Sequence, residues 1–162
     1  ATVVAATGGS TNAGLHLPAM AHEAGIDFDL LEVAEIFKKT PYIADLKPGG
    51  QYVAKDMYEA GGVPMLLKTL LEGGYLHGDC KTVTGKSLGD NLEEITFNPD
   101  QKVIYSVTNP LSPTGGVVGL TGSLAPEGAI VKVAGMETLQ FEGAARCFDC
   151  EEDAFKAVEV GD

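Results

Sequence analysis

A change in sequence pattern near residue 97 constrains the fold more than any other feature of this chain. Before it, apolar residues recur at helical spacing, and the periodic segments end at Pro or Gly. After it, the segments are short, rich in β-branched residues and separated by Gly and Pro turns. Helices followed by strands predict an α/β fold in two parts, joined near residues 96–116, where Pro, Asn and Gly concentrate. Each part alone resembles only a portion of a domain.

Helices are predicted in the first part from apolar periodicity and from end signals. Asp29 and Glu32 have the spacing of a capping box, and Ser87 and Asp90 are placed to cap a shorter helix. Pro18 removes one backbone hydrogen bond from its segment, so a kink or a restart is expected there. The predicted helical segments are residues 13–24, 27–41, 61–74 and 84–95.

Strands are predicted in the second part, because its apolar segments are too short for helices and end at turn residues. A final helix is predicted after them, with Asp149 as its cap and Glu152 at the third helical position. The predicted strands are residues 102–107, 115–122, 128–135 and 139–148.

The charge of the chain limits its partners. The formal net charge is −12, and the longest basic run is the pair Lys38-Lys39. Nucleic acids and anionic membranes both attract a positive surface, so neither is expected as a partner. No apolar run approaches the roughly 20 residues of a membrane span, and the first residues lack the basic start of a signal peptide. Three cysteines, an odd number, suit a reducing compartment, and we expect a cytoplasmic protein.

The stretch from Gly8 to Asn12, Gly-Gly-Ser-Thr-Asn, interrupts an apolar run just before the first predicted helix. It lacks the Lys of a P-loop and the second Gly of a Gly-x-Ser-x-Gly nucleophile turn. A Gly-rich turn that opens a helix presents amides and hydroxyls to an anion such as a carboxylate. The alternative is an ordinary helix cap by Ser10 or Thr11, which the spacing alone favours.

The cysteines and histidines do not form a metal-binding pattern. Cys147 and Cys150 supply only two ligands, and Cys80 is far away in the sequence. Cys150 also lies at the start of the last predicted helix, among acidic residues that oppose a thiolate. No pair of histidines has the i,i+4 spacing of a zinc-binding helix; the three are His16, His22 and His77.

Six polar segments, taken in order, closely resemble the dihydroxy-acid dehydratase family, which also includes phosphogluconate and sugar-acid dehydratases. They are GGSTNAGLHLPAMAHEAGI, TPYIADLKPGGQYVAKDMYEAGGVP, LHGDCKTVTGK, NPLSPTGG, GSLAPEGAIVKVAG and FEGAARCFDCEEDAF. Ala13 and the following Gly-Leu-His-Leu are closer to the dihydroxy-acid and sugar-acid branches. Family members are several times longer, so the 162 residues resemble an internal fragment.

The resemblance implies that residues 1–97 end an N-terminal α/β domain and residues 98–162 begin a swivelling β-barrel domain. It implies a hydro-lyase of branched-chain amino acid biosynthesis that converts 2,3-dihydroxy carboxylic acids to 2-keto acids. A small hydroxy acid is the implied substrate, and a homodimer or homotetramer the implied assembly. An iron–sulfur cluster and Mg²⁺ are implied as cofactors, with ligands outside this chain, so the fragment alone is expected to be inactive.

Within the 162 residues, no catalytic residue or metal ligand is expected. For the Gly-Gly-Ser-Thr-Asn turn, the resemblance favours substrate binding over a helix cap. Asp79 and Lys47 are expected at the surface or between domains. Two alternatives stay open: a sugar-acid dehydratase of the same family, and a non-catalytic binding or structural module derived from its fold. The expected substrate-binding residues are Gly9, Ser10, Thr11 and Asn12.

Overall fold

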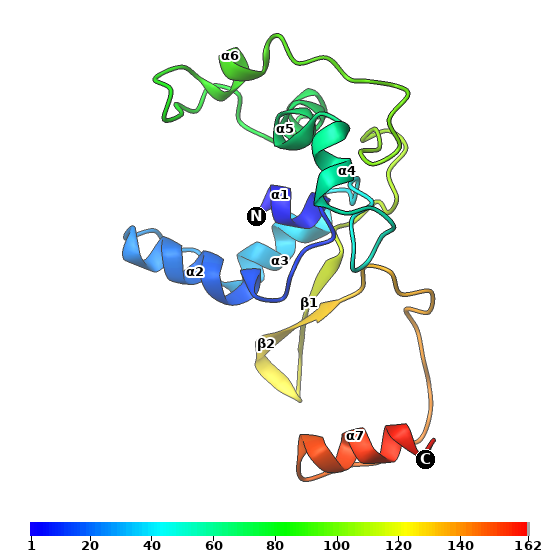
Figure 1. Ribbon diagram of the computed structural model, residues 1–162. Coiled ribbons are helices and arrows are strands. Elements are labelled where there is room, and N and C mark those ends of the chain that lie inside the picture. The colour runs from blue at the N-terminus through cyan, green and yellow to red at the C-terminus, as the bar shows by residue number, and fades with distance from the viewer. Residues whose placement is uncertain (162) are drawn as a thin grey trace.

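The computed structural model describes residues 1–161 and combines helices with one two-stranded sheet (Figure 1). None of the described helices is long and apolar enough to cross a membrane. The helices in chain order are α1 (Thr2–Ala6), α2 (Ala13–Glu23), α3 (Leu30–Lys39), α4 (Ala54–Glu59), α5 (Gly62–Glu72), α6 (Leu88–Leu92) and α7 (Glu151–Glu159). The strands are β1 (Val117–Gly122) and β2 (Ala125–Lys132).

Two buried clusters hold the described part of the chain together, and α1 contributes to both. The larger cluster joins α1, α4 and α5 to two extended segments, and its Ile43, Leu70 and Ile104 are at most 1% exposed. The smaller one packs α1, α2 and α3 against β1 around Phe37 and Val33. Burying such side chains removes apolar surface from water, which is the main stabilising contribution to a fold.

The segment 42–46 runs between α1 and the chain that precedes the hairpin. The Ala44 amide donates to the Ala6 carbonyl at 2.9 Å, and the Asp45 amide donates to the Val103 carbonyl at 2.9 Å. The Tyr42 amide donates to the Ser112 carbonyl at 3.0 Å. These backbone bonds bring residues far apart in the sequence together and fix the position of Tyr42.

The strands β1 and β2 form an antiparallel hairpin in which Val117 is paired with Lys132 and Gly122 with Ala125. The hairpin packs on α3, and a side chain at Gly119 would collide with the Ala34 Cβ. Gly119 therefore allows the close approach of strand and helix. The α/β class is confirmed, and in residues 1–161 the sheet is this hairpin, not a closed barrel.

The helices predicted before residue 97 are all present, although their ends differ by a few residues. Asp29 caps α3 through the amides of Leu31 and Glu32, at 2.8 and 2.9 Å, and the capping box is complete. The helix α2 continues through Pro18, so it does not restart there; the kink, the other expectation at Pro18, stays a prediction. The short helices α1 and α4 were not predicted, because five or six residues carry too little periodicity.

Two of the four predicted strands are wrong. Residues 102–107 form only an isolated bridge, in which Ile104 pairs with Ala44, and residues 139–148 contain no strand. A strand needs a neighbour for its backbone groups, and neither segment has a continuous one in the described part of the chain. Apolar, β-branched composition shows that a segment suits a sheet, but it does not supply the partner.

The cap predicted for the last helix is also wrong. The helix α7 begins at Glu151 with Cys150 as its N-cap residue, and no side chain accepts a cap hydrogen bond there. Cys150 is extended, with φ −148° and ψ 160°, so Asp149 lies one residue too early to cap the first turn. Figure 1 shows α7 apart from the other elements, beyond a long segment without helix or strand.

Candidate functional site

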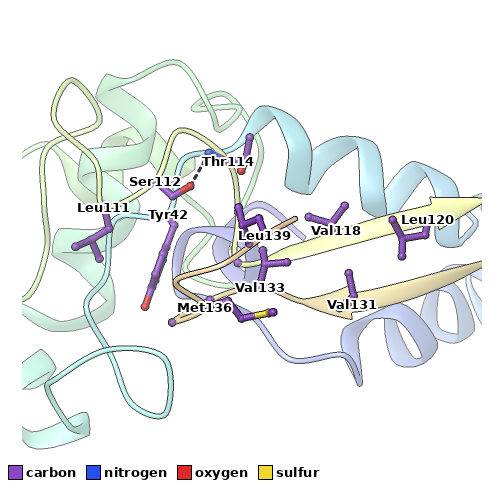
Figure 2. Close-up of a pocket in the computed structure, with 14 residues that line it drawn as sticks. Tyr42, Leu111, Ser112, Thr114, Val118, Leu120, Val131, Val133, Met136 and Leu139 are labelled. Carbon is purple, nitrogen blue, oxygen red and sulfur yellow. Dashed lines mark hydrogen bonds between the residues drawn. The ribbon is translucent and has the colours of Figure 1, made fainter. Parts of the chain in front are cut away.

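A pocket of about 480 Å³ lies where the β1–β2 hairpin meets the segment 111–116 (Figure 2). Its wall on the hairpin is apolar and consists of Val118, Leu120 and Val131, with Val133 directly after β2. Its polar groups come from the other side: Tyr42, Ser112 and Thr114. A concave, mostly apolar site with a few polar groups is the usual form of a small-molecule pocket.

The glycine turn predicted from the sequence does not line this pocket, but its Gly8 lies next to two residues that do, Tyr42 and Gly116. Gly8 and Gly9 have φ of 84° and 67°, the left-handed region that glycine adopts without strain. A Cβ on Gly8 would lie 3.1 Å from the Tyr42 ring, and a Cβ on Gly116 would collide with the Gly8 carbonyl oxygen. Glycine at positions 8 and 116 therefore lets the turn, Tyr42 and the end of the hairpin meet.

The residues after the glycines are exposed, but the amides of the first turn of α2 are already engaged. Asn12 is the N-cap residue and makes no side-chain cap bond, and its amide donates to Ser10 Oγ at 3.3 Å. The amides of Ala13 and Gly14 donate to the carbonyls of Ser10 and Thr11, each at 3.0 Å. In this conformation the amides of residues 12–14 are not free for an anion. The backbone amides of Gly9, Ser10 and Thr11 make no hydrogen bond within residues 1–161, so they remain available together with the exposed hydroxyls and the Asn12 side chain.

Tyr42 is the polar residue of the pocket that sequence reasoning missed. Its side chain is buried, and its hydroxyl has no hydrogen-bond partner among residues 1–161. Burial raises the pKa of Tyr42 above its ordinary value, and the Asp45 carboxylate raises it further. Tyr42 is therefore a neutral donor at physiological pH. The sequence offered only one signal, a tyrosine directly after Pro41 in a polar segment.

Asp45, three residues after Tyr42 in the sequence, is also buried. One of its oxygens, Oδ1, accepts from the Gln51 amide at 3.0 Å, whereas Oδ2 has no partner among residues 1–161. Asp45 does not line the pocket. The negative charge of its carboxylate disfavours ionisation of Tyr42, which does line the pocket.

Residues 1–161 contain no cluster of metal-binding side chains of the kind that an iron–sulfur cluster requires. Cys80, Cys147 and Cys150 are all exposed, and no three His, Cys, Asp or Glu side chains gather within residues 1–161. Asp79 and Lys47 are exposed as well. A cluster of iron and sulfur needs several cysteine thiolates in one place, and the described part of the chain does not bring its cysteines together in that way.

Two sequence models of one family match the chain. The model described as dihydroxy-acid/6-phosphogluconate dehydratase N-terminal matches residues 1–91. The corresponding C-terminal model matches residues 102–162. Together they cover nearly all of the chain, and the unmatched residues 92–101 overlap the start of the predicted junction at 96–116.

Curated relatives agree with the family models. A dihydroxy-acid dehydratase of Parvibaculum lavamentivorans is 77% identical over 98% of this chain, which corresponds to 28% of the relative. Dihydroxy-acid dehydratase 2 of Bradyrhizobium diazoefficiens is 69% identical, and a dihydroxy-acid dehydratase of Saccharolobus islandicus is 52% identical. Those two matches cover 98% and 99% of this chain and 28% and 29% of the relatives. The chain thus spans little more than a quarter of their length.

Proposed function

The chain belongs to the dihydroxy-acid/6-phosphogluconate dehydratase family, and we propose that it is part of a hydro-lyase converting 2,3-dihydroxy carboxylic acids to 2-keto acids. The observation that carries this proposal is the 77% identity to a dihydroxy-acid dehydratase over 98% of the chain. A role in branched-chain amino acid biosynthesis is part of the same proposal. The proposed substrate is then a small, negatively charged hydroxy acid.

The reaction sets the requirements for the site. A base removes the proton from C2, the C3 hydroxyl takes up a proton and leaves as water, and the resulting enol tautomerises to the 2-keto acid. The family resemblance implies an iron–sulfur cluster and Mg²⁺ for this chemistry. Because residues 1–161 hold no ligand set for either, we propose that these ligands and the catalytic base lie in other parts of the protein.

We propose that the glycine turn and the pocket beside it are the contribution of this chain to the substrate site. The exposed Ser10, Thr11 and Asn12 supply two hydroxyls and one amide, which suit the carboxylate and hydroxyls of the substrate. The glycines before them keep the backbone close to Tyr42 and Gly116. The role of this chain is to bind and orient the substrate and to exclude water from one side.

We also propose two domains, residues 1–97 and 98–162, with the second part beginning a barrel. The two family models support this division, since one ends at residue 91 and the other begins at residue 102. The hairpin β1–β2 is then the first pair of strands of the larger sheet.

A sugar-acid dehydratase is the second candidate function, and the pocket argues against it. The wall formed by the hairpin is apolar and suits a branched aliphatic group better than a chain of hydroxyls. The test is turnover of the full-length protein with 2,3-dihydroxy-3-methylbutanoate and with gluconate, measured as the 2-keto acid formed. We expect the branched acid to be the better substrate by kcat/KM. Formation of no 2-keto acid from either would contradict the proposed activity and favour a non-catalytic module.

Thr11→Val tests the substrate role of the turn in the full-length protein. The substitution removes the hydroxyl but keeps the shape of an exposed residue, so we expect an unchanged Tm and a kcat/KM that falls by about tenfold. If Thr11 is only part of a helix cap, the Tm falls while kcat/KM per folded molecule stays near that of the wild type. That result would remove the turn from the site.

A further inference from the structure

Two cysteines lie at the point where the chain enters α7. Cys147 and Cys150 are separated by two residues, and both are exposed free thiols. The chain bends at residues 149 and 150 and then begins α7, with Cys150 as the N-cap residue. An exposed cysteine with a second one close by is the usual arrangement of a site that is oxidised reversibly, because the second thiol can resolve the first product.

The segment before α7 turns back along the helix, so that Cys147 and Cys150 lie on the two sides of a turn (Figure 1). Arg146 and Phe148 line one pocket together with Ala157 of α7, and Ala157 is only 8% exposed. The Arg146 guanidinium lies over the Phe148 ring, 5.0 Å from its centroid, which favours this shape of the segment. A tight turn of four residues brings its end Cα atoms within about 7 Å, which is also the reach of a disulfide.

A metal site is the other common use of two cysteines with this spacing. It needs further ligands, and no three His, Cys, Asp or Glu side chains gather in the part of the chain that the structure describes. The first turn of α7 is acidic, with Glu151, Glu152 and Asp153, and these carboxylates repel an anionic oxidant. They slow the encounter, whereas the stability of a disulfide, once it has formed, depends on the geometry of the turn.

We propose that Cys147 and Cys150 form a reversible disulfide, which makes residues 147–150 an oxidation site at the start of α7. The oxidant is a small disulfide such as oxidised glutathione. One cysteine thiolate attacks a sulfur of the oxidant, forms a mixed disulfide and releases one glutathione thiolate. The second cysteine thiolate attacks the protein sulfur of the mixed disulfide and releases the other glutathione. The two cysteines lose two electrons and two protons, and the oxidant gains them.

The disulfide restricts the chain directly before α7, whose first turn has no side-chain cap. In a reducing compartment it is transient and forms only under oxidising conditions. The inference does not rest on the proposed activity, since neither cysteine lines the pocket or belongs to the glycine turn.

The test incubates the full-length protein with equal concentrations of reduced and oxidised glutathione until the products no longer change. The remaining thiols are then blocked with N-ethylmaleimide, and tryptic peptides are analysed by mass spectrometry. Trypsin cleaves after Arg146 and Lys156, so both cysteines fall within residues 147–156, while Cys80 falls within residues 69–81. We expect peptide 147–156 with an internal disulfide to exceed its doubly blocked form about tenfold.

Two variants are the matched controls, and both replace exposed residues. Cys150→Ser should abolish the internal disulfide and leave Cys147 with glutathione or N-ethylmaleimide. Cys80→Ser should leave the internal disulfide of peptide 147–156 unchanged. The proposal is overturned if this peptide of the wild type carries N-ethylmaleimide on both cysteines, or glutathione on either of them, as its main form.

Discussion

Two phenylalanines show how differently the two ends of this chain are built. Phe37 of α3 is fully buried in the smaller cluster, whereas Phe141, in the segment between β2 and α7, is 93% exposed. The same contrast holds for their surroundings. The elements α1, α2, α3 and β1 pack on one another, whereas α7 exposes Phe155 and Val158, and its C-cap residue Val160 is exposed as well. The first region buries an apolar cluster of its own around Phe37, although its α2 also exposes Leu15 and Met20. We expect the partners of the second to lie in the rest of a longer protein, because the chain spans 28% of a close relative.

The largest expected effect comes from truncating these two side chains in the 162-residue chain. Phe37→Ala should destabilise it by about 3–5 kcal/mol, because it leaves a cavity in a closely packed cluster. Phe141→Ala should change stability by about 0.5 kcal/mol or less, since the ring contacts mainly solvent. Urea unfolding measures both. Equal losses of unfolding free energy in the two variants would contradict the contrast between the two regions. A loss for Phe141→Ala that is larger in the full-length protein than in the 162-residue chain would support it further.

The same contrast explains how much of the fold the sequence could predict. The helices α2, α3, α5 and α6 follow from local signals, namely apolar periodicity and capping residues such as Asp29. The strands predicted at 102–107 and 139–148 were wrong, because pairing depends on a neighbour that periodicity does not describe. Local rules predicted these helices but missed the short α1 and α4, and only two of the four strands that they predicted are present.

The candidate site was predictable only in part. The glycine turn stood out by composition, and the structure places its Gly8 next to Tyr42 and Gly116, which line the pocket. Tyr42 could not be predicted, because its burial and its unpartnered hydroxyl arise from contacts with segments far away in the sequence. A single tyrosine carries no spacing that distinguishes a pocket residue from a core residue.

A smaller effect is expected at the helix caps of the two regions. Asp29 accepts from two amides of α3, so Asp29→Ala should destabilise the chain by about 1 kcal/mol. Asp149 makes no cap bond to α7, and Asp149→Ala should change stability by about 0.3 kcal/mol or less. Thermal unfolding of the two variants checks this. A comparable loss for Asp149→Ala would show that Asp149 caps α7 in solution.

The smallest effect is a dependence on pH at the start of α6. The side-chain hydrogen bond with Ser87, then the backbone bond, lowers the pKa of Asp90 below its ordinary value. The folded state therefore gains stability from the ionised carboxyl above the unfolded pKa, and loses it as the pH falls through the folded pKa. A carboxyl titration by NMR should show the lowered pKa in the wild type and a higher one in Ser87→Ala. Identical values would contradict the cap.

Hydrogen exchange with and without substrate tests most directly the claim that this chain carries part of the substrate site. In the full-length protein, 2,3-dihydroxy-3-methylbutanoate should slow exchange in residues 8–14 and 112–118, where the turn and the pocket meet. Residues 151–159 of α7 should exchange at the same rate in both samples. Unchanged exchange in both site segments, in a protein that still turns the substrate over, would place the substrate elsewhere and contradict the account.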